Sequence, residues 1–272
     1  YEIALHVSDA LRFDGLNDFV DLSAAASALT SGTGDFNYEA WIRPDALHHG
    51  RMQILQIGDD VSTNDALTLY VEGGVLKSDL TNVPGPVGTT NLLGAWHHVA
   101  VSYDSALGTD NMTIYVYGVA EASATMSPAI AGAVRANIGL LDNGVTRIAS
   151  FEGDVADVLA WSEARTAEDI KANLTTEFDF ENAPGGLVAN WHLDDGPGAT
   201  VQDHIAGNDG TLLNSTEQVY SGAPVETNSP HAVFDGDGDY IDRSAAAAGL
   251  DTGQSGFTYE AWIKTSNSVA EY

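Results

Sequence analysis

The stretch FDGLNDFVDLSAAASALTSGTGDFNYEAWI, residues 13–42, recurs without a gap as FDGDGDYIDRSAAAAGLDTGQSGFTYEAWI at residues 234–263. The two copies are identical at 17 of 30 positions. A repeat whose copies lie this far apart corresponds to a whole domain rather than to one unit of a solenoid. The sequence therefore predicts a complete module over residues 1–221 and the start of a second, truncated module over residues 222–272. We expect the second part not to be stable alone, because about 40 residues cannot close a β-sandwich.

Strand signals dominate the first module. Short runs rich in β-branched and aromatic residues alternate with clusters of glycine, asparagine, aspartate and proline, as in strands joined by turns. In the run MTIYVYG, the side chains of Met112, Ile114 and Val116 share one face of a strand. The five clearest runs are YEAWI (38–42), ALTLYV (66–71), WHHVAVSY (96–103), MTIYVYG (112–118) and GDVADVLAW (153–161).

The segment TAEDIKANL has the pattern of a short helix. Thr166 is followed three residues later by Asp169, which forms an approximate capping box, and Ile170 and Leu174 lie one helical turn apart. Many short strands and one short helix predict an all-β fold, an antiparallel jelly-roll β-sandwich. In this fold, Gly15 of the FDG turn needs a positive φ. Structural roles are expected for Trp41, Trp96, Trp161 and Trp191, which pack in the core, and for His97 and His98.

The charge of the chain limits its partners. It has 39 acidic and 10 basic residues, a formal net charge of −29, and the few lysines and arginines form no basic stripe. Nucleic acid is therefore not an expected partner. Membrane insertion is not expected either, because no apolar run reaches the roughly 18 residues of a span. The absence of cysteine excludes a disulfide scaffold, a thiolate metal site and a cysteine nucleophile.

A set of motifs in a fixed order resembles the laminin-G-like, concanavalin-A-type jelly rolls of bacterial surface and secreted proteins, which are distantly similar to pentraxins. The matching pieces are ALRFDGLNDFVDL, FNYEAWIRP, WHHVAVSYD, MTIYVYG, FEGDVADVLAWSEARTAEDI and GLVANWHLDDGPGATVQDHIAGNDGTL. They cover most of residues 10–213. The chain departs from the family at Tyr117, where the hairpin usually carries an aspartate. The resemblance implies a bacterial protein that is extracellular or on the cell surface.

Three classes of function compete. The resemblance implies a non-enzymatic adhesion or binding module for a glycan or a cell-surface protein, assisted by calcium. The repeat is equally compatible with a structural spacer or a subunit of an extracellular filament, whose partners are other copies of the same module. A glycoside hydrolase on the same sandwich is the third class, and no catalytic residue is assigned for it.

The hydrolase hypothesis depends on the carboxylates of EGDVAD. A retaining glycosidase needs two carboxyl groups roughly 5 Å apart. On a regular strand Glu152 and Asp154 share a face, whereas Asp157 points away unless a bulge turns it. The same stretch also fits the non-enzymatic family pattern, with Gly153 at the start of the strand. We therefore expect no enzymatic activity.

Calcium is the expected metal, because hard oxygen ligands are abundant and suit an ion that takes six to eight of them. Two groups are the candidates. In the pentraxin-like relatives, an Asx pair before the strand that matches ALTLYV and an acidic loop before FEGDV meet around calcium. The first group is Asp59, Asp60, Asn64, Asp65, Asp142 and Asn143, and the second is the turn with Asp14, Asn17 and Asp18. The alternative is that these are ordinary solvated acidic turns.

The segment Asn190 to Leu212 has two interpretations. We expect it to return and pack on the module begun by ALRFDG. Alternatively, it is the head of the second module, since family members often carry a similar motif just before their FDG strand. A structure in which Trp191 contacts nothing before residue 180 would exclude the first interpretation.

Overall fold

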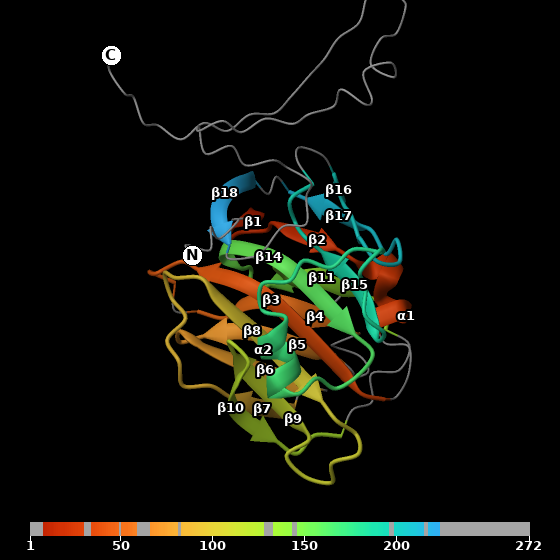
Figure 1. Ribbon diagram of the computed structural model, residues 1–272. Helices are drawn as coiled ribbons and strands as arrows, with labels where there is room; N and C mark the ends of the chain where they lie inside the picture. Colours follow the sequence, from red (N-terminus) through yellow and green to blue (C-terminus); the bar gives the residue numbers. More distant parts are fainter. Residues whose placement is uncertain are drawn as a thin grey trace, which may run out of the picture. The chain divides into compact units, whose positions relative to one another are not determined.

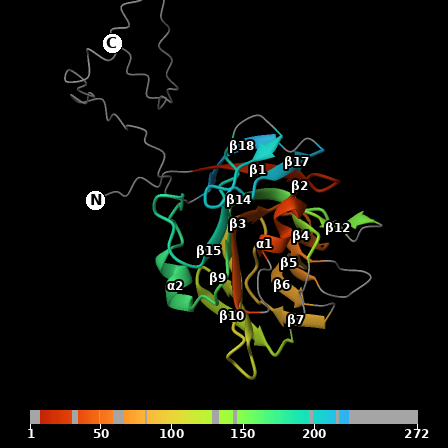
Figure 2. The same cartoon turned by 90° about the vertical axis from the view of Figure 1, so that its right-hand side faces the viewer.

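The structure is a computed structural model. It describes residues 8–29, 34–48, 50–58, 66–80, 83–127, 133–142, 146–195, 199–214 and 217–223. The fold in this part of the chain consists of two large antiparallel sheets that pack face to face (Figures 1 and 2). No helix among these residues is long and apolar enough to cross a membrane.

The first sheet has the strand order β10-β9-β8-β3-β14-β1-β18, and β15 also pairs with β14. Its strands are β1 (Ser8–Asp14), β3 (Phe36–Pro44), β8 (His97–Tyr103), β9 (Met112–Val116), β10 (Val119–Ala124), β14 (Glu152–Trp161), β15 (Leu187–Trp191) and β18 (Glu217–Ala223). Four of the five predicted strand segments form β3, β8, β9 and β14, which confirms them. The fifth, ALTLYV, forms β5 of the second sheet.

The second sheet has the order β16-β17-β2-β11-β4-β5-β6-β7. Its strands are β2 (Phe19–Asp21), β4 (Met52–Ile57), β5 (Leu67–Glu72), β6 (Val75–Leu80), β7 (Val83–Val87), β11 (Ala136–Ile138), β16 (Thr200–Val201) and β17 (Gly210–Leu213). A separate hairpin joins β12 (Leu141–Asp142) to β13 (Arg147–Ile148). The predicted antiparallel β-sandwich is therefore confirmed.

The core lies between the two sheets and follows the alternation of the strands. Met112, Ile114 and Val116 all face it, as their spacing predicts. Phe13 is fully buried and meets Phe151 edge to face, with ring centroids 6.2 Å apart. Gly15, directly after β1, has a φ of +78°, so the predicted positive φ is confirmed.

The predicted helix is α2 (Ala167–Ala172), and its capping box is complete. The backbone N–H of Asp169 donates to the Thr166 hydroxyl, and the Asp169 carboxylate accepts from the backbone N–H of Thr166. Ile170 is buried against Ala100 and Tyr115, so α2 covers part of the first sheet on the face away from the second sheet. A 3₁₀ turn η1 (Ser23–Ala25) and a four-residue helix α1 (Ala26–Leu29) were not predicted.

The segment Asn190 to Leu212 packs on the first module, as expected. β15 pairs with β14 and β17 pairs with β2, while Trp191 is buried in the main core. The Asn214 side chain also donates to the backbone oxygen of Asn17. The alternative, that this segment heads the second module, is therefore wrong. Residues 224–272, with the second repeat copy, lie outside the described residues, so the truncated second module stays a prediction.

Candidate functional site

The polar side chains of the first sheet gather on its outer face, the face away from the second sheet. Alternate residues of β3, among them Glu39, Trp41 and Arg43, point to this face while their neighbours enter the core. The segment 162–186, which contains α2, covers part of it, and the indole N–H of Trp41 donates to the Leu174 carbonyl at 2.9 Å. This cover divides the polar residues into a half-exposed group and a buried group.

The half-exposed group is centred on Asp154. Its carboxylate is fully buried and accepts from Arg12 Nη1 at 3.0 Å and from Arg43 Nε at 2.6 Å. The Arg43 guanidinium also lies over the ring of Trp96, 5.3 Å from its centroid. Trp96 is partly buried and packs on the small cluster formed by Ala10, Trp41 and Ala156. An aromatic ring and two guanidinium groups are thus fixed together at the surface.

The bulge that the hydrolase hypothesis required is present. The pairing of β14 with β3 shifts between Ala156 and Leu159, and Asp157 has a φ of +47°. Because Ala156 already faces outward and Val158 enters the core, the extra residue turns Asp157 to the outer face. Burial raises the pKa of Asp157 well above its usual value, and the charges of Glu177 and Glu39 raise it further.

The other two carboxylates contact basic side chains. Asp154 is held by two arginines, and Glu152 lies 2.6 Å from Nδ1 of His48. Asp157 is only 3% exposed beneath the covering segment. A carboxylate that is bound by guanidinium groups is poorly suited to donate a proton to a leaving group. This geometry gives Glu152 and Asp154 structural partners and buries Asp157.

The buried group lies beneath the segment 162–186. His98 Nε2 is 3.2 Å from Glu39 Oε2, and both side chains are almost fully buried, so His98 has the structural partner expected of it. Farther along the sheet, His192 Nδ1 lies 3.0 Å from Glu177 Oε1. Asp157 lies near both pairs, since the charges of Glu177 and Glu39 both raise its pKa.

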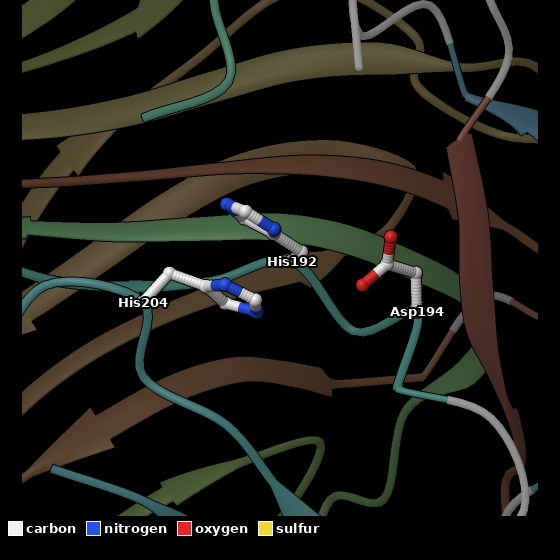
Figure 3. A group of neighbouring side chains, drawn as sticks. All are labelled: His192, Asp194 and His204. Atoms are coloured by element: carbon white, nitrogen blue, oxygen red, sulfur yellow. The ribbon is translucent and has the colours of Figure 1, made fainter. Parts of the chain in front are cut away.

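A compact cluster of His192, Asp194 and His204 lies at the end of β15 (Figure 3). One nitrogen of each ring and one oxygen of Asp194 all lie within 4.8 Å of one another. The two rings stack, with centroids 3.8 Å apart and planes inclined by 12°. The cluster offers two nitrogens and a carboxylate oxygen, a donor set that divalent transition metals accept.

Burial controls protonation in this cluster. It lowers the pKa of His192 to about 4, more than the hydrogen bond to the Phe178 carbonyl raises it. The ring is therefore neutral at pH 7, and its contact with Glu177 is not an ion pair there. Burial also raises the pKa values of Asp194 and Asp195, against the lowering effect of His204.

The structure brings part of the predicted calcium turn together. Asp14 Oδ1 accepts from the backbone N–H of Leu16 at 2.8 Å, and Asp18 Oδ2 accepts from that of Asp14 at 3.1 Å. Asp18 is 3% exposed, its burial raises its pKa, and its Oδ1 has no hydrogen-bond partner. Asn17 is exposed, and its backbone oxygen accepts from Asn214. The turn thus has one buried oxygen suited to a cation.

The other predicted calcium group is described only at Asp142. This residue lies in β12, and its Oδ2 accepts from Arg147 Nε at 3.1 Å. The remaining members, Asp59, Asp60, Asn64, Asp65 and Asn143, lie outside the described residues. Their convergence around calcium therefore stays a prediction.

Sequence reasoning missed the cluster of His192, Asp194 and His204, because it considered only oxygen ligands. Its signal is the spacing H-x-D in WHLDD, followed by a second histidine in VQDHIAG. The chain is not extended between His192 and Asp194, since Leu193 has a φ of +66°, so the H-x-D spacing alone does not bring the two side chains together. The arrival of His204 depends on a tertiary contact, its backbone N–H donating to the Asn190 carbonyl at 2.9 Å.

Solved structures with a similar fold include three from different organisms. A candidate carbohydrate-binding protein from Bacteroides ovatus has a TM-score of 0.62 and 22% identity, covering 82% of this chain and 62% of its own. The CBM40 of Ruminococcus gnavus IT-sialidase, bound to α2,3 sialyllactose, has a TM-score of 0.47 and 14% identity. The match covers 59% of this chain and 95% of the CBM40 chain. A heptameric SAP-like pentraxin from Limulus polyphemus has a TM-score of 0.44 and 17% identity, and the match covers 61% of this chain and 81% of the pentraxin chain.

This chain thus spans less than two thirds of the Bacteroides ovatus protein. No curated protein matches its sequence. A laminin-G family model, described as the concanavalin A-like lectin/glucanases superfamily, matches residues 14–171, which is more than half of the chain. The matched region runs from the end of β1 through α2 and includes Arg43, Trp96 and Asp154. On the strength of this match and of the sandwich that it accompanies, the chain belongs to the laminin-G-like family of the concanavalin A-like lectin and glucanase superfamily.

Proposed function

We propose that this chain is a non-enzymatic, extracellular carbohydrate-binding module of a bacterial surface protein built from tandem modules. The observation that carries the proposal is the lectin-type sandwich of a family that contains lectins and glucanases. The Bacteroides ovatus protein, described as a candidate carbohydrate binder, supports it at the level of the fold. The contacts of Glu152 with His48 and of Asp154 with two arginines favour binding over hydrolysis.

The binding surface in this proposal is the half-exposed group around Trp96. An aromatic ring offers a sugar an apolar face, and the Arg12 and Arg43 guanidinium groups offer donors to its hydroxyl groups. The side chains of Arg12 and Arg43 are 41% and 34% exposed, so part of each can contact a ligand. The ion pair with Asp154 holds both in place before the ligand arrives, which lowers the entropic cost of binding.

A glycan array, with and without calcium, tests this function. The wild-type chain should bind a restricted set of glycans, and Trp96→Ala should lose at least about tenfold in affinity, the loss of one stacked ring. Phe180→Ala is the matched control, because Phe180 is an aromatic side chain that is 80% exposed outside the group. Equal binding by Trp96→Ala and wild type would place the ligand elsewhere, and absence of all glycan binding would contradict the function.

Calcium assistance is part of the proposal. The buried, unpartnered Oδ1 of Asp18 supports a cation in the first turn, and the net charge of −29 favours cation binding in general. After chelation, millimolar calcium in low-salt buffer should raise the melting temperature, because the ion binds only the folded state. Asp18→Asn should reduce this shift. Calorimetry without a heat of binding, together with an unchanged melting temperature, would exclude calcium.

The alternative is a structural spacer or filament subunit that contacts other copies of its own module. The repeat of residues 13–42 at 234–263 favours it, because a tandem array needs no small ligand. Electron microscopy of the longer protein would show polymers under this alternative. Glycan binding by a protein that forms no polymers would favour the binding module.

A further inference from the structure

The cluster of His192, Asp194 and His204 at the end of β15 has no role in the proposed carbohydrate-binding surface. His192 directly follows this strand, and its backbone oxygen accepts from the N–H of Asp157 at 3.1 Å. His204 is held beside it by the hydrogen bond to the Asn190 carbonyl, while Asp203 accepts from the backbone N–H of Asn190. Backbone hydrogen bonds therefore hold the main chain of both histidines in place, and with it the attachment points of the two rings.

His192 has the hydrogen-bond arrangement of a metal ligand. Its Nε2 lies 2.9 Å from the Phe178 carbonyl oxygen, which can only accept, so Nε2 carries the hydrogen. A ring N–H donated to a backbone carbonyl is the usual way in which a ligating histidine is oriented. The other ring nitrogen, Nδ1, lies 3.0 Å from Glu177 Oε1. With Nε2 donating to Phe178, Nδ1 is the His192 atom that could bind an ion.

His204 supplies a second, independent observation. Its Nε2 is buried and has no hydrogen-bond partner, although a buried nitrogen left without a partner costs free energy. Asp194 completes a set in which two nitrogens and a carboxylate oxygen lie within 4.8 Å of one another (Figure 3). A bound ion would satisfy the His204 nitrogen and bring counter-charge to Asp194.

We propose that His192, His204, Asp194 and Glu177 form a binding site for a divalent transition-metal ion of the zinc class. Imidazole nitrogens together with carboxylates suit zinc, cobalt or nickel, whereas calcium takes oxygen ligands alone. The site is separate from the calcium candidates, none of which belongs to it. It joins the end of β15, the segment after β16 and the covering segment that carries Glu177.

The site closes as the ion binds. Ligand atoms on one zinc ion lie at most about 4.2 Å apart, twice a bond of roughly 2.1 Å, so the cluster must contract slightly. The two rings are nearly parallel, and lone pairs lie in the ring planes. Parallel planes do not meet at a common ion, so at least one ring must rotate about its Cβ–Cγ bond.

Metal titration of the full chain tests the site. After treatment with a chelator, the chain should bind one equivalent of Co²⁺, with visible bands of four-coordinate cobalt, and Zn²⁺ should displace it. Excess Ca²⁺ should not compete. In NMR spectra, Zn²⁺ should shift the imidazole signals of His192 and His204 and leave those of His48 unchanged.

Variants locate the ion. His204→Gln and Asp194→Asn should each weaken Zn²⁺ affinity more than roughly 100-fold. Loss of a residue that only hydrogen-bonds to a ligand costs roughly 10–100-fold, and loss of a ligand should cost more. His48→Gln is the matched control, because His48 forms a histidine–carboxylate pair with Glu152 outside the cluster. Circular dichroism without metal shows whether each variant folds, and the NMR shifts of the wild type need no variant. The proposal is overturned if the wild type binds no stoichiometric metal, or if both cluster variants bind like the control.

Discussion

Asp154 illustrates how single residues of the outer face are stabilised. Its side chain is completely buried, yet both carboxylate oxygens are bound by the guanidinium groups of Arg12 and Arg43, whose side chains are about a third or more exposed. A buried charge is tolerated only when it is paired and hydrogen-bonded. The arginines thus occupy both oxygens of the Asp154 carboxylate.

Asp154→Asn should destabilise the chain by about 1–3 kcal/mol, because hydrogen bonds to a charged group are lost while the arginines can still reach water. Glu152→Gln is the control. Its half-exposed pair with His48 should contribute less than about 1 kcal/mol. Urea unfolding of the three proteins at pH 7 measures both values. Wild-type stability in Asp154→Asn would contradict the importance of this ion pair.

Glu121 joins β10 to the residues that follow β7 at one edge of the sandwich. It lies on β10, the edge strand of the first sheet, and accepts hydrogen bonds from the backbone N–H and the hydroxyl groups of Thr89 and Thr90, which follow β7. Because β7 is the edge strand of the second sheet, this carboxylate links the two sheets across their open edge. Desolvation raises the pKa of Glu121, but the hydrogen bonds outweigh it and lower the pKa to about 2.

This link should make stability depend on pH. The pKa of Glu121 falls from 4.5 to about 2 on folding, so its contribution is complete above pH 4.5 and disappears as the pH falls toward 2. Glu121→Gln should be less stable than wild type at pH 7, and the difference should shrink between pH 4.5 and 2. Thermal unfolding of both proteins across this range measures it. A difference that is constant with pH would contradict the role of the charge.

The helix α2 depends on its cap. Thr166→Ala removes the hydroxyl that accepts from Asp169, and should cost about 0.5–2 kcal/mol of unfolding free energy. Thr166→Ser keeps the hydroxyl and should remain close to wild type. Denaturant unfolding compares the three chains. If Thr166→Ala is as stable as wild type, tertiary packing alone holds α2 on the first sheet.

At the scale of the whole molecule, the sandwich is closed by its last strands. β15 pairs with β14, β17 with β2, and β18 with β1, so segments after residue 186 complete both sheets. Trp191 also fills the main core. The paired strands of the first module thus run through residue 223, where the described residues end, and the boundary at 221 stays a prediction.

Truncation tests this closure. A chain ending at residue 223 should unfold cooperatively with a melting temperature near that of residues 1–272, because it keeps all paired strands. A chain ending at residue 186 should not fold, since it loses Trp191 and leaves strand edges unpaired. A fragment of residues 229–272 should not fold alone. Calorimetry and circular dichroism measure all three, and a cooperative transition in the chain ending at 186 would contradict the assignment.

The sequence by itself determined the local structure. Alternation places Met112, Ile114 and Val116 in the core, and Thr166 with Asp169 begins the helix, because both signals depend on residues a few positions apart. The ordered motifs likewise predicted the sandwich and its family. Part of the candidate site was predictable as well, since the acidic turn of Asp14 and Asp18 is local in sequence.

Only the tertiary structure decided where distant residues meet. The bulge at Asp157 arises from the pairing of β14 with β3 and β15, and nothing in EGDVAD alone turns this side chain outward. The cluster of His192, Asp194 and His204 depends equally on β15 adding to the first sheet and on His204 bonding to Asn190. Long-range pairing is set by the packing of the whole sandwich, which no short stretch of sequence encodes.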